Sequence, residues 1–89
     1  MNGASNNILL LDNLENELEK LLIFLKSEAN SDEHFVEIKT VAEIKKAALN
    51  NNESEVLELL ASISEWSIEI AEKIGLEEVI NAYYLSRSL

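Results

Sequence analysis

The chain has 89 residues, with 17 acidic side chains against 7 basic ones, a net charge of −10 and no cysteine or proline. Chains of this length bury one small core, so we expect residues 1–89 to form a single helical domain. The missing cysteines exclude a disulfide and a thiolate metal site. The negative charge repels nucleic acid and anionic membrane surfaces, so we expect neither as a partner.

The apolar segments are too short to cross a membrane. The longest, Ile8–Leu11 and Leu21–Leu25, are far below the ~20 residues that a bilayer-spanning helix needs. No basic region precedes the first of them, so the N-terminus does not resemble a secretory signal. We therefore expect a cytoplasmic protein.

The residue types favour helices throughout. Leu, Glu, Ala, Ile and Lys dominate, and most of these are good helix formers. The β-branched residues recur at helical spacing instead of alternating as they would in strands. The sequence therefore predicts an all-α fold, a small four- to five-helix bundle with short turns. Residues 1–7 are small and polar, and we expect them to be frayed.

The first predicted helix begins at Ile8 or Asp12 and ends at Glu28. Leucines recur there at steps of three and four, forming one apolar stripe that Ile23 and Phe24 widen. A stripe this wide indicates contact with two neighbouring helices or with a second copy of the chain. We predict homodimerisation through this helix. The predicted interface consists of Leu14, Leu18, Leu21, Leu22, Leu25, Trp66, Tyr83 and Tyr84.

The second predicted helix runs from Glu33 to Leu49. It follows the turn-forming stretch Ala29–Asp32, in which Ser31 or Asp32 would accept hydrogen bonds from free backbone N–H groups. One face of this helix is expected to pack, formed by Phe35, Ile38, Val41, Ala42, the stem of Lys45 and Ala48.

Three consecutive asparagines, Asn50–Asn52, predict the end of this helix and the start of another. Asparagine tolerates left-handed backbone geometry and competes with helical hydrogen bonding. Asn52 or Ser54 would cap the third helix, with Glu53 and Glu55 in its first turn, where negative charge is favourable.

Two alternatives remain open beyond Ile63. Either the chain breaks and Ser64 caps a new helix, or one helix continues to Ile74. Likewise, Gly75 either ends a helix or lies inside one, at a cost of about 1 kcal/mol relative to alanine. Glu77 and Glu78 suit the first turn of a last helix.

The aromatic residues of the second half are candidates for both core and interface. Trp66 is the only tryptophan, and we expect it to pack in the core. Tyr83 and Tyr84 are adjacent, so on a helix their side chains point about 100° apart. We therefore expect that the two are not both fully buried.

The second half of the chain also resembles a known module. The residues are Ile44-Lys45-Lys46-Ala47-Ala48, the asparagine turn, Val56-Leu57-x-Leu59-Leu60, Trp66, Ala71 and Ile74-Gly75. This pattern resembles a short helical tail module of bacterial proteins, including some abortive-infection and other defence-type proteins. The resemblance implies a bacterial association domain without catalytic residues.

One cluster could carry metal chemistry. In the stretch Asp32-Glu33-His34-x-x-Glu37, Glu37 lies one turn after Glu33 and three residues after His34, so one helix face could touch a metal ion. A working site needs further ligands, and His34 is the only histidine, so we favour acidic capping of a helix start. We predict no metal and no cofactor.

The usual catalytic motifs are missing. The sequence has no glycine-rich phosphate loop and no glycine-flanked nucleophile, so we predict no catalytic residues and no enzyme. We expect a non-catalytic protein–protein association domain, homodimeric. The alternative is an acidic inhibitor or nucleic-acid mimic that binds a basic partner surface. Its negative face would be formed by Glu53, Glu55, Glu58, Glu65, Glu69 and Glu72.

Overall fold

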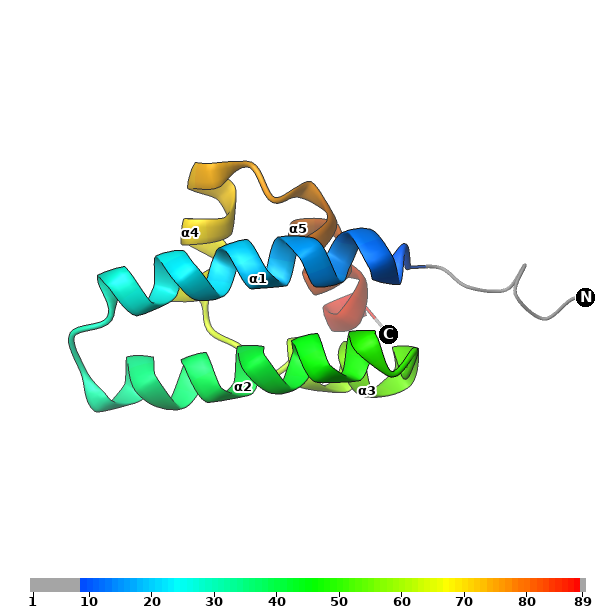
Figure 1. Cartoon of the computed structure of the whole chain (residues 1–89), viewed down its shortest axis with the longest axis horizontal. Helices are drawn as coiled ribbons and strands as arrows, with labels where there is room; N and C mark the ends of the chain where they lie inside the picture. The colour runs from blue at the N-terminus through cyan, green and yellow to red at the C-terminus, as the bar shows by residue number, and fades with distance from the viewer. Residues whose placement is uncertain (1–8, 89) are drawn as a thin grey trace, which may run out of the picture.

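The computed structural model describes residues 9–88, so the expected fraying of residues 1–7 lies outside the described part. Residues 9–88 form five helices and no strand, which confirms the all-α bundle of four to five helices (Figure 1). None of these helices is both long and apolar enough to cross a membrane. The helices are α1 (Leu11–Glu28), α2 (Asp32–Leu49), α3 (Glu53–Leu60), α4 (Glu65–Ile74) and α5 (Glu77–Ser88).

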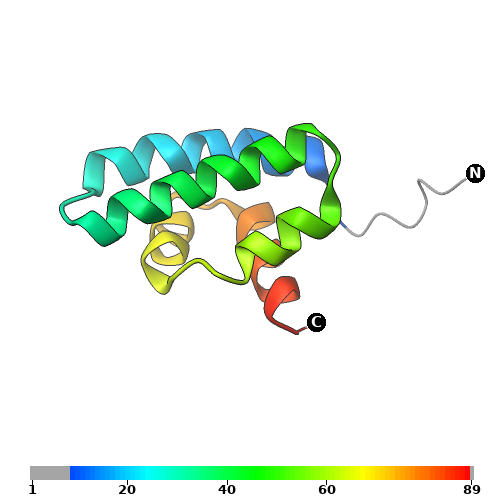
Figure 2. The ribbon, with the colours of Figure 1, turned by 90° about the horizontal axis from the view of Figure 1, so that it is seen from below.

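The helices form two layers. The long helices α1 and α2 lie side by side and antiparallel, as a hairpin closed by a short turn (Figure 1). The shorter helices α3, α4 and α5 pack on one side of this hairpin (Figure 2). α1 contacts α2, α4 and α5, while α3 contacts α2 and α5. The hairpin is therefore the scaffold on which the short helices are placed.

The leucine stripe of α1 forms the centre of the core. Leu14 is 1% exposed, and Leu18, Leu21 and Leu25 are fully buried. Burying one such side chain contributes roughly 1.5–3 kcal/mol. Because α1 contacts three helices of its own chain, neighbouring helices account for the width of the stripe. This corrects the expectation that these four leucines face a second copy of the chain.

Asparagines end α2 and start α3, as predicted. Asn51 adopts a left-handed conformation with φ of 56°. The Asn52 N–H donates to the carbonyl of Ala47 at 2.9 Å, and the Asn51 N–H donates to that of Ala48 at 3.1 Å, which closes the end of α2. The Asn52 side chain then accepts from the Glu55 N–H at 3.3 Å, so Asn52 is the N-cap of α3.

The structure resolves both alternatives for residues 60–75. α3 ends at Leu60, and α4 starts after Ser64, whose hydroxyl accepts from the Trp66 N–H at 3.2 Å. Gly75 has φ of 76° and ends α4, while the following Leu76 N–H donates to the Ala71 carbonyl at 2.9 Å. The chain therefore breaks at both positions.

Glutamates of the hairpin cap the helices of the other layer. On α1, Glu17 Oε1 accepts from the Val79 N–H in the first turn of α5 at 3.0 Å. On α2, Glu37 accepts from the N–H of Ser64 at 2.9 Å and from its hydroxyl at 2.8 Å. Glu37 also accepts from the buried hydroxyl of Ser67. A carboxylate at a helix N-terminus satisfies free N–H groups and opposes the positive end of the helix dipole.

The prediction of which residues of α2 pack in the core is only partly right. Val41 and Ala48 are buried, but Phe35 is 56% exposed. Ile44 is fully buried and lies nine residues after Phe35. At about 100° per residue, these two side chains point to opposite sides of the helix. The face of α2 that packs is therefore the one centred near Ile44, and it leaves Phe35 outside.

Candidate functional site

The predicted interface residues separate into three groups. The leucines Leu14, Leu18, Leu21 and Leu25 belong to the core, and Leu22 and Trp66 are half-buried against it. Tyr83 is 6% exposed, whereas the neighbouring Tyr84 is 55% exposed. The expectation that these tyrosines are not both buried is confirmed. A surface for association must therefore be sought among residues outside the leucine stripe.

The candidate metal cluster on α2 is used to hold α4. The imidazole of His34 stacks on the indole of Trp66, and His34 Nδ1 accepts from the Asn30 N–H at 3.2 Å. Glu37 is bound to Ser64 and Ser67 at the start of α4, while Glu33 is exposed. Between residues 9 and 88 there is no group of three or more His, Cys, Asp or Glu residues placed to hold a metal ion.

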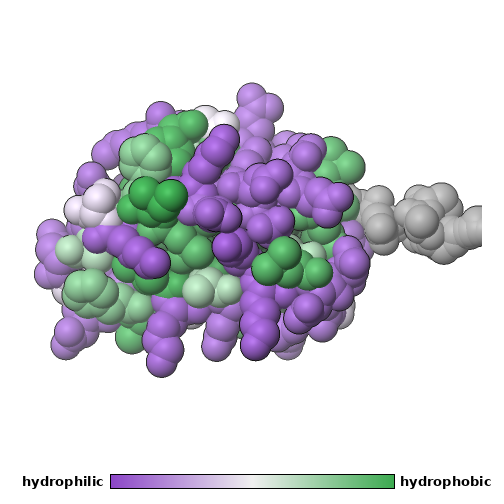
Figure 3. Space-filling model, in the orientation of Figure 1, coloured by the Kyte–Doolittle hydropathy of each residue, from purple (hydrophilic) through white to green (hydrophobic). Residues whose placement is uncertain are grey.

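An apolar surface lies where α1 and α2 join. Among residues 9–88, seven large apolar side chains are exposed, and four of them come from the last two turns of α1 and the first two turns of α2. Figure 3 shows hydrophobic side chains gathered mainly on the half of the molecule that contains this turn. We call this surface the hairpin end, and it consists of Ile23 (62% exposed), Phe24 (44%), Phe35 (56%) and Val36 (64%).

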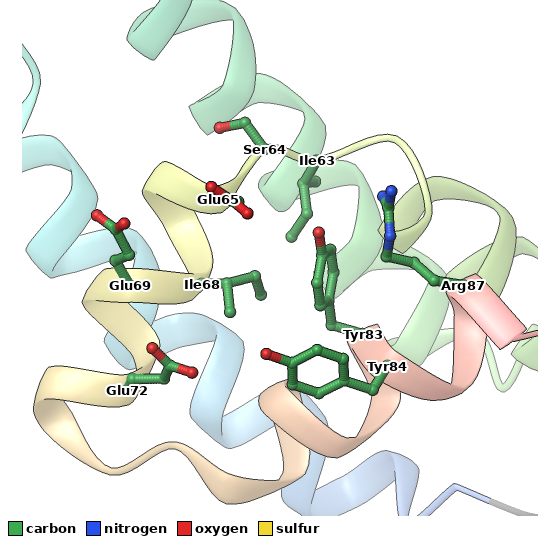
Figure 4. A pocket seen from close by; sticks show the side chains of 9 residues that line it. All are labelled: Ile63, Ser64, Glu65, Ile68, Glu69, Glu72, Tyr83, Tyr84 and Arg87. Carbon is green, nitrogen blue, oxygen red and sulfur yellow. The ribbon is translucent and has the colours of Figure 1, made fainter.

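The second surface is an open groove of about 610 Å³ between α4 and α5 (Figure 4). Glutamates of α4 form one wall at positions i, i+4 and i+7 of the helix, and tyrosines of α5 form the facing wall. Residues of the link between α3 and α4 close one end. We call it the α4–α5 groove, and it is lined by Ile63, Ser64, Glu65, Ile68, Glu69, Glu72, Tyr83, Tyr84 and Arg87.

The charge of the α4–α5 groove is negative. The lining residues carry three carboxylates and one guanidinium, that of Arg87, which leaves two net negative charges. Arg87 lies over the ring of Tyr83, 5.4 Å from its centroid, and donates to the Ala61 carbonyl at 3.4 Å. The groove therefore combines negative charge with aromatic surface.

The sequence does not predict the hairpin end and predicts the groove only in part. The leucine stripe dominates the pattern of α1, so Ile23 and Phe24 read as its margin, and the helical spacing of Phe35 predicts the packed face of α2. The spacing of Glu65, Glu69 and Glu72 does show a shared acidic face. The facing tyrosines come from another helix, and no local pattern predicts that pairing.

A salt bridge also links the two long helices. Lys45 Nζ lies 3.3 Å from Glu19 Oε1, which joins α2 to α1 at the surface. This contact is exposed on the Glu19 side, so it contributes little to stability.

Comparisons of the chain with protein-family models, with curated proteins and with solved structures gave no match. The resemblance of the second half to a defence-type tail module therefore stays a prediction, and the two surfaces carry the functional argument.

Proposed function

We propose that this chain is a non-catalytic protein–protein association domain that forms a homodimer through the hairpin end. The observation that supports the proposal is the exposure of Ile23, Phe24, Phe35 and Val36 on either side of one turn. Clustered exposed apolar side chains are uncommon on small monomeric proteins and mark interaction sites. Aromatic side chains such as the two phenylalanines bury a large area and contribute much of the energy of such contacts.

A second copy of the chain is the partner that we favour. In a two-fold symmetric dimer the same surface is used on both copies, and an apolar patch is complementary to itself. The partners each carry a net charge of −10, so their long-range repulsion opposes association. Added salt screens this repulsion, and we therefore expect dimerisation to strengthen as ionic strength rises.

The experiment uses matched surface variants. Phe35→Glu and Ile23→Glu place a charge in the hairpin end without touching the core, so both variants should fold and sediment as monomers. Leu49→Glu is the control, because Leu49 is 57% exposed at the opposite end of α2. The proposal fails if Leu49→Glu disrupts the dimer as much as the hairpin-end variants do.

An acidic inhibitor remains the alternative, and the α4–α5 groove favours it. Three of the six residues of the expected negative face, Glu65, Glu69 and Glu72, line this one groove. Glu58 lies elsewhere, in a second hollow bounded by Leu57, Ala61 and Ser86. The acidic surface that supports this function is therefore narrower than the sequence pattern indicated. In both functions the cytoplasmic location and the bacterial source stay predictions.

A further inference from the structure

We propose that the α4–α5 groove binds the guanidinium group of an arginine side chain on a protein partner. The groove shares no residue with the hairpin end, so this proposal does not rest on self-association. It rests on the alternative function, in which this chain is an acidic inhibitor of a basic partner, and it names the chemical group of the partner that is bound.

The groove places negative charge beside an apolar side chain. Glu65 and Glu72 lie on the same face of α4, and Figure 4 shows the Glu72 carboxylate directed toward α5. The side chain of Ile68 lies between the two walls in this view. Carboxylates beside an apolar floor suit a long side chain with an aliphatic stem and a cationic head.

The hydroxyl of Tyr83 is a polar group with no protein partner among the described residues. Tyr83 is 6% exposed, and Figure 4 shows its hydroxyl at the closed end of the groove, near Ile63. This hydroxyl forms no hydrogen bond with any residue between 9 and 88. A hydroxyl that has no protein partner and is directed into a groove can accept a hydrogen bond from a ligand that enters the groove.

The tyrosines of α5 give the groove an aromatic wall. Tyr84 is 55% exposed, and its ring meets that of Tyr83 edge to face, with centroids 5.4 Å apart. Figure 4 shows the Tyr84 hydroxyl directed across the groove toward α4. The exposed ring therefore offers a face to a cation that approaches from solvent.

Arginine fits this arrangement better than lysine. A guanidinium is planar, stacks on aromatic rings and donates in several directions at once, whereas an ammonium is a compact, strongly hydrated charge. The chain itself shows that a guanidinium packs here, since Arg87 lies over the other tyrosine of the wall. Arg87 repels a second cation, but the three glutamates outnumber it and leave the groove negative.

The test titrates a capped tripeptide, acetyl-glycyl-arginyl-glycinamide, into the isotope-labelled full chain and follows amide shifts by NMR. We expect saturable shifts confined to α4 and α5. The matched peptide with citrulline, which has the same shape but no charge, should bind at least about fivefold more weakly. The lysine peptide should also bind more weakly than the arginine peptide.

Two results would overturn the proposal. One is that the citrulline peptide binds as tightly as the arginine peptide, and the other is that the shifts do not saturate at millimolar arginine peptide.

Three variants locate the binding. Glu72→Gln removes one charge from the groove and should weaken the arginine peptide by up to about fivefold, whereas Glu43→Gln, at an exposed position on α2, should not. Tyr83→Phe should weaken binding of the arginine peptide and leave the melting temperature unchanged, because no described residue hydrogen-bonds to that hydroxyl.

Equal effects of Glu72→Gln and Glu43→Gln on peptide binding would show unspecific attraction to an acidic protein and would contradict the proposal. If the chain is a monomer and still binds the peptide, the homodimer proposal fails and the arginine-site proposal stands.

Discussion

The imidazole of His34 lies parallel to the indole of Trp66, with ring centroids 3.7 Å apart and an angle of 5° between the planes. This stack joins the N-terminal part of α2 to the first turn of α4. One turn further along α2, Glu37 binds the start of α4 through Ser64 and Ser67. The two contacts together fix the helix that forms the acidic wall of the groove.

Replacing Glu37 should lower the stability of the fold. Glu37→Ala leaves the buried Ser67 hydroxyl and the Ser64 N–H without their acceptor, and we expect a loss of about 1–3 kcal/mol in the free energy of unfolding. Urea unfolding followed by circular dichroism measures it. Glu33→Ala is the control, because Glu33 is an exposed glutamate one turn earlier on α2. Equal losses for the two variants would contradict this role of Glu37.

Removing the imidazole should change the signal of the only tryptophan. His34→Ala exposes one face of the indole to water, so the fluorescence emission of Trp66 should move to longer wavelength. We also expect a loss of about 0.5–1.5 kcal/mol in stability, the range for an aromatic pair. Lys39→Ala, at an exposed position of α2, should alter neither quantity. An unchanged emission maximum in His34→Ala would argue against the stack.

A glutamate introduced on the buried face of α1 should unfold the chain, whereas one introduced on its exposed face should not. Leu18 is fully buried, so Leu18→Glu places an unpaired carboxylate in the core and should unfold the chain. Ile23 is 62% exposed, so Ile23→Glu should retain the helical circular dichroism spectrum and still unfold in a cooperative melting transition. If Leu18→Glu stayed folded and only lost its partner, the stripe would be an interface after all.

The end of α4 should depend on the backbone of Gly75. Its φ of 76° disfavours any residue with a Cβ, and an added Cβ would meet no heavy atom within 4 Å. Gly75→Ala should therefore cost about 1–2 kcal/mol through backbone strain alone. Gly75→Asn should cost less, since asparagine tolerates this conformation. A larger loss with asparagine, measured by thermal unfolding, would point to crowding instead of strain.

The boundary between α2 and α3 was predictable because it depends on neighbours in sequence: Asn51 takes the left-handed conformation and Asn52 caps α3. Gly75 ends α4 through equally local contacts, but the sequence left open whether it ends a helix or lies inside one. The choice between a break and one long helix near Ser64 stayed open, because the residues that hold this break include Glu37, 27 positions earlier.

The partners of each apolar face were less predictable. A leucine stripe has the same spacing whether it packs on helices of its own chain or on a second copy, so Leu18 and Leu21 were assigned to the wrong contact. Phe35 was placed on the packed face because its spacing from Ile38 fits a helix stripe, yet the core lies on the opposite side. The groove depends on how α4 meets α5, which no local spacing reveals.

Sedimentation equilibrium of the full chain over a range of concentrations, at low and at high salt, tests the central claim most directly. Association through the hairpin end predicts a mass that rises toward twice the 10.0 kDa of one chain, and rises further when salt screens the repulsion between two negative copies. A mass that stays at 10.0 kDa at every concentration and salt level would contradict the proposed homodimer.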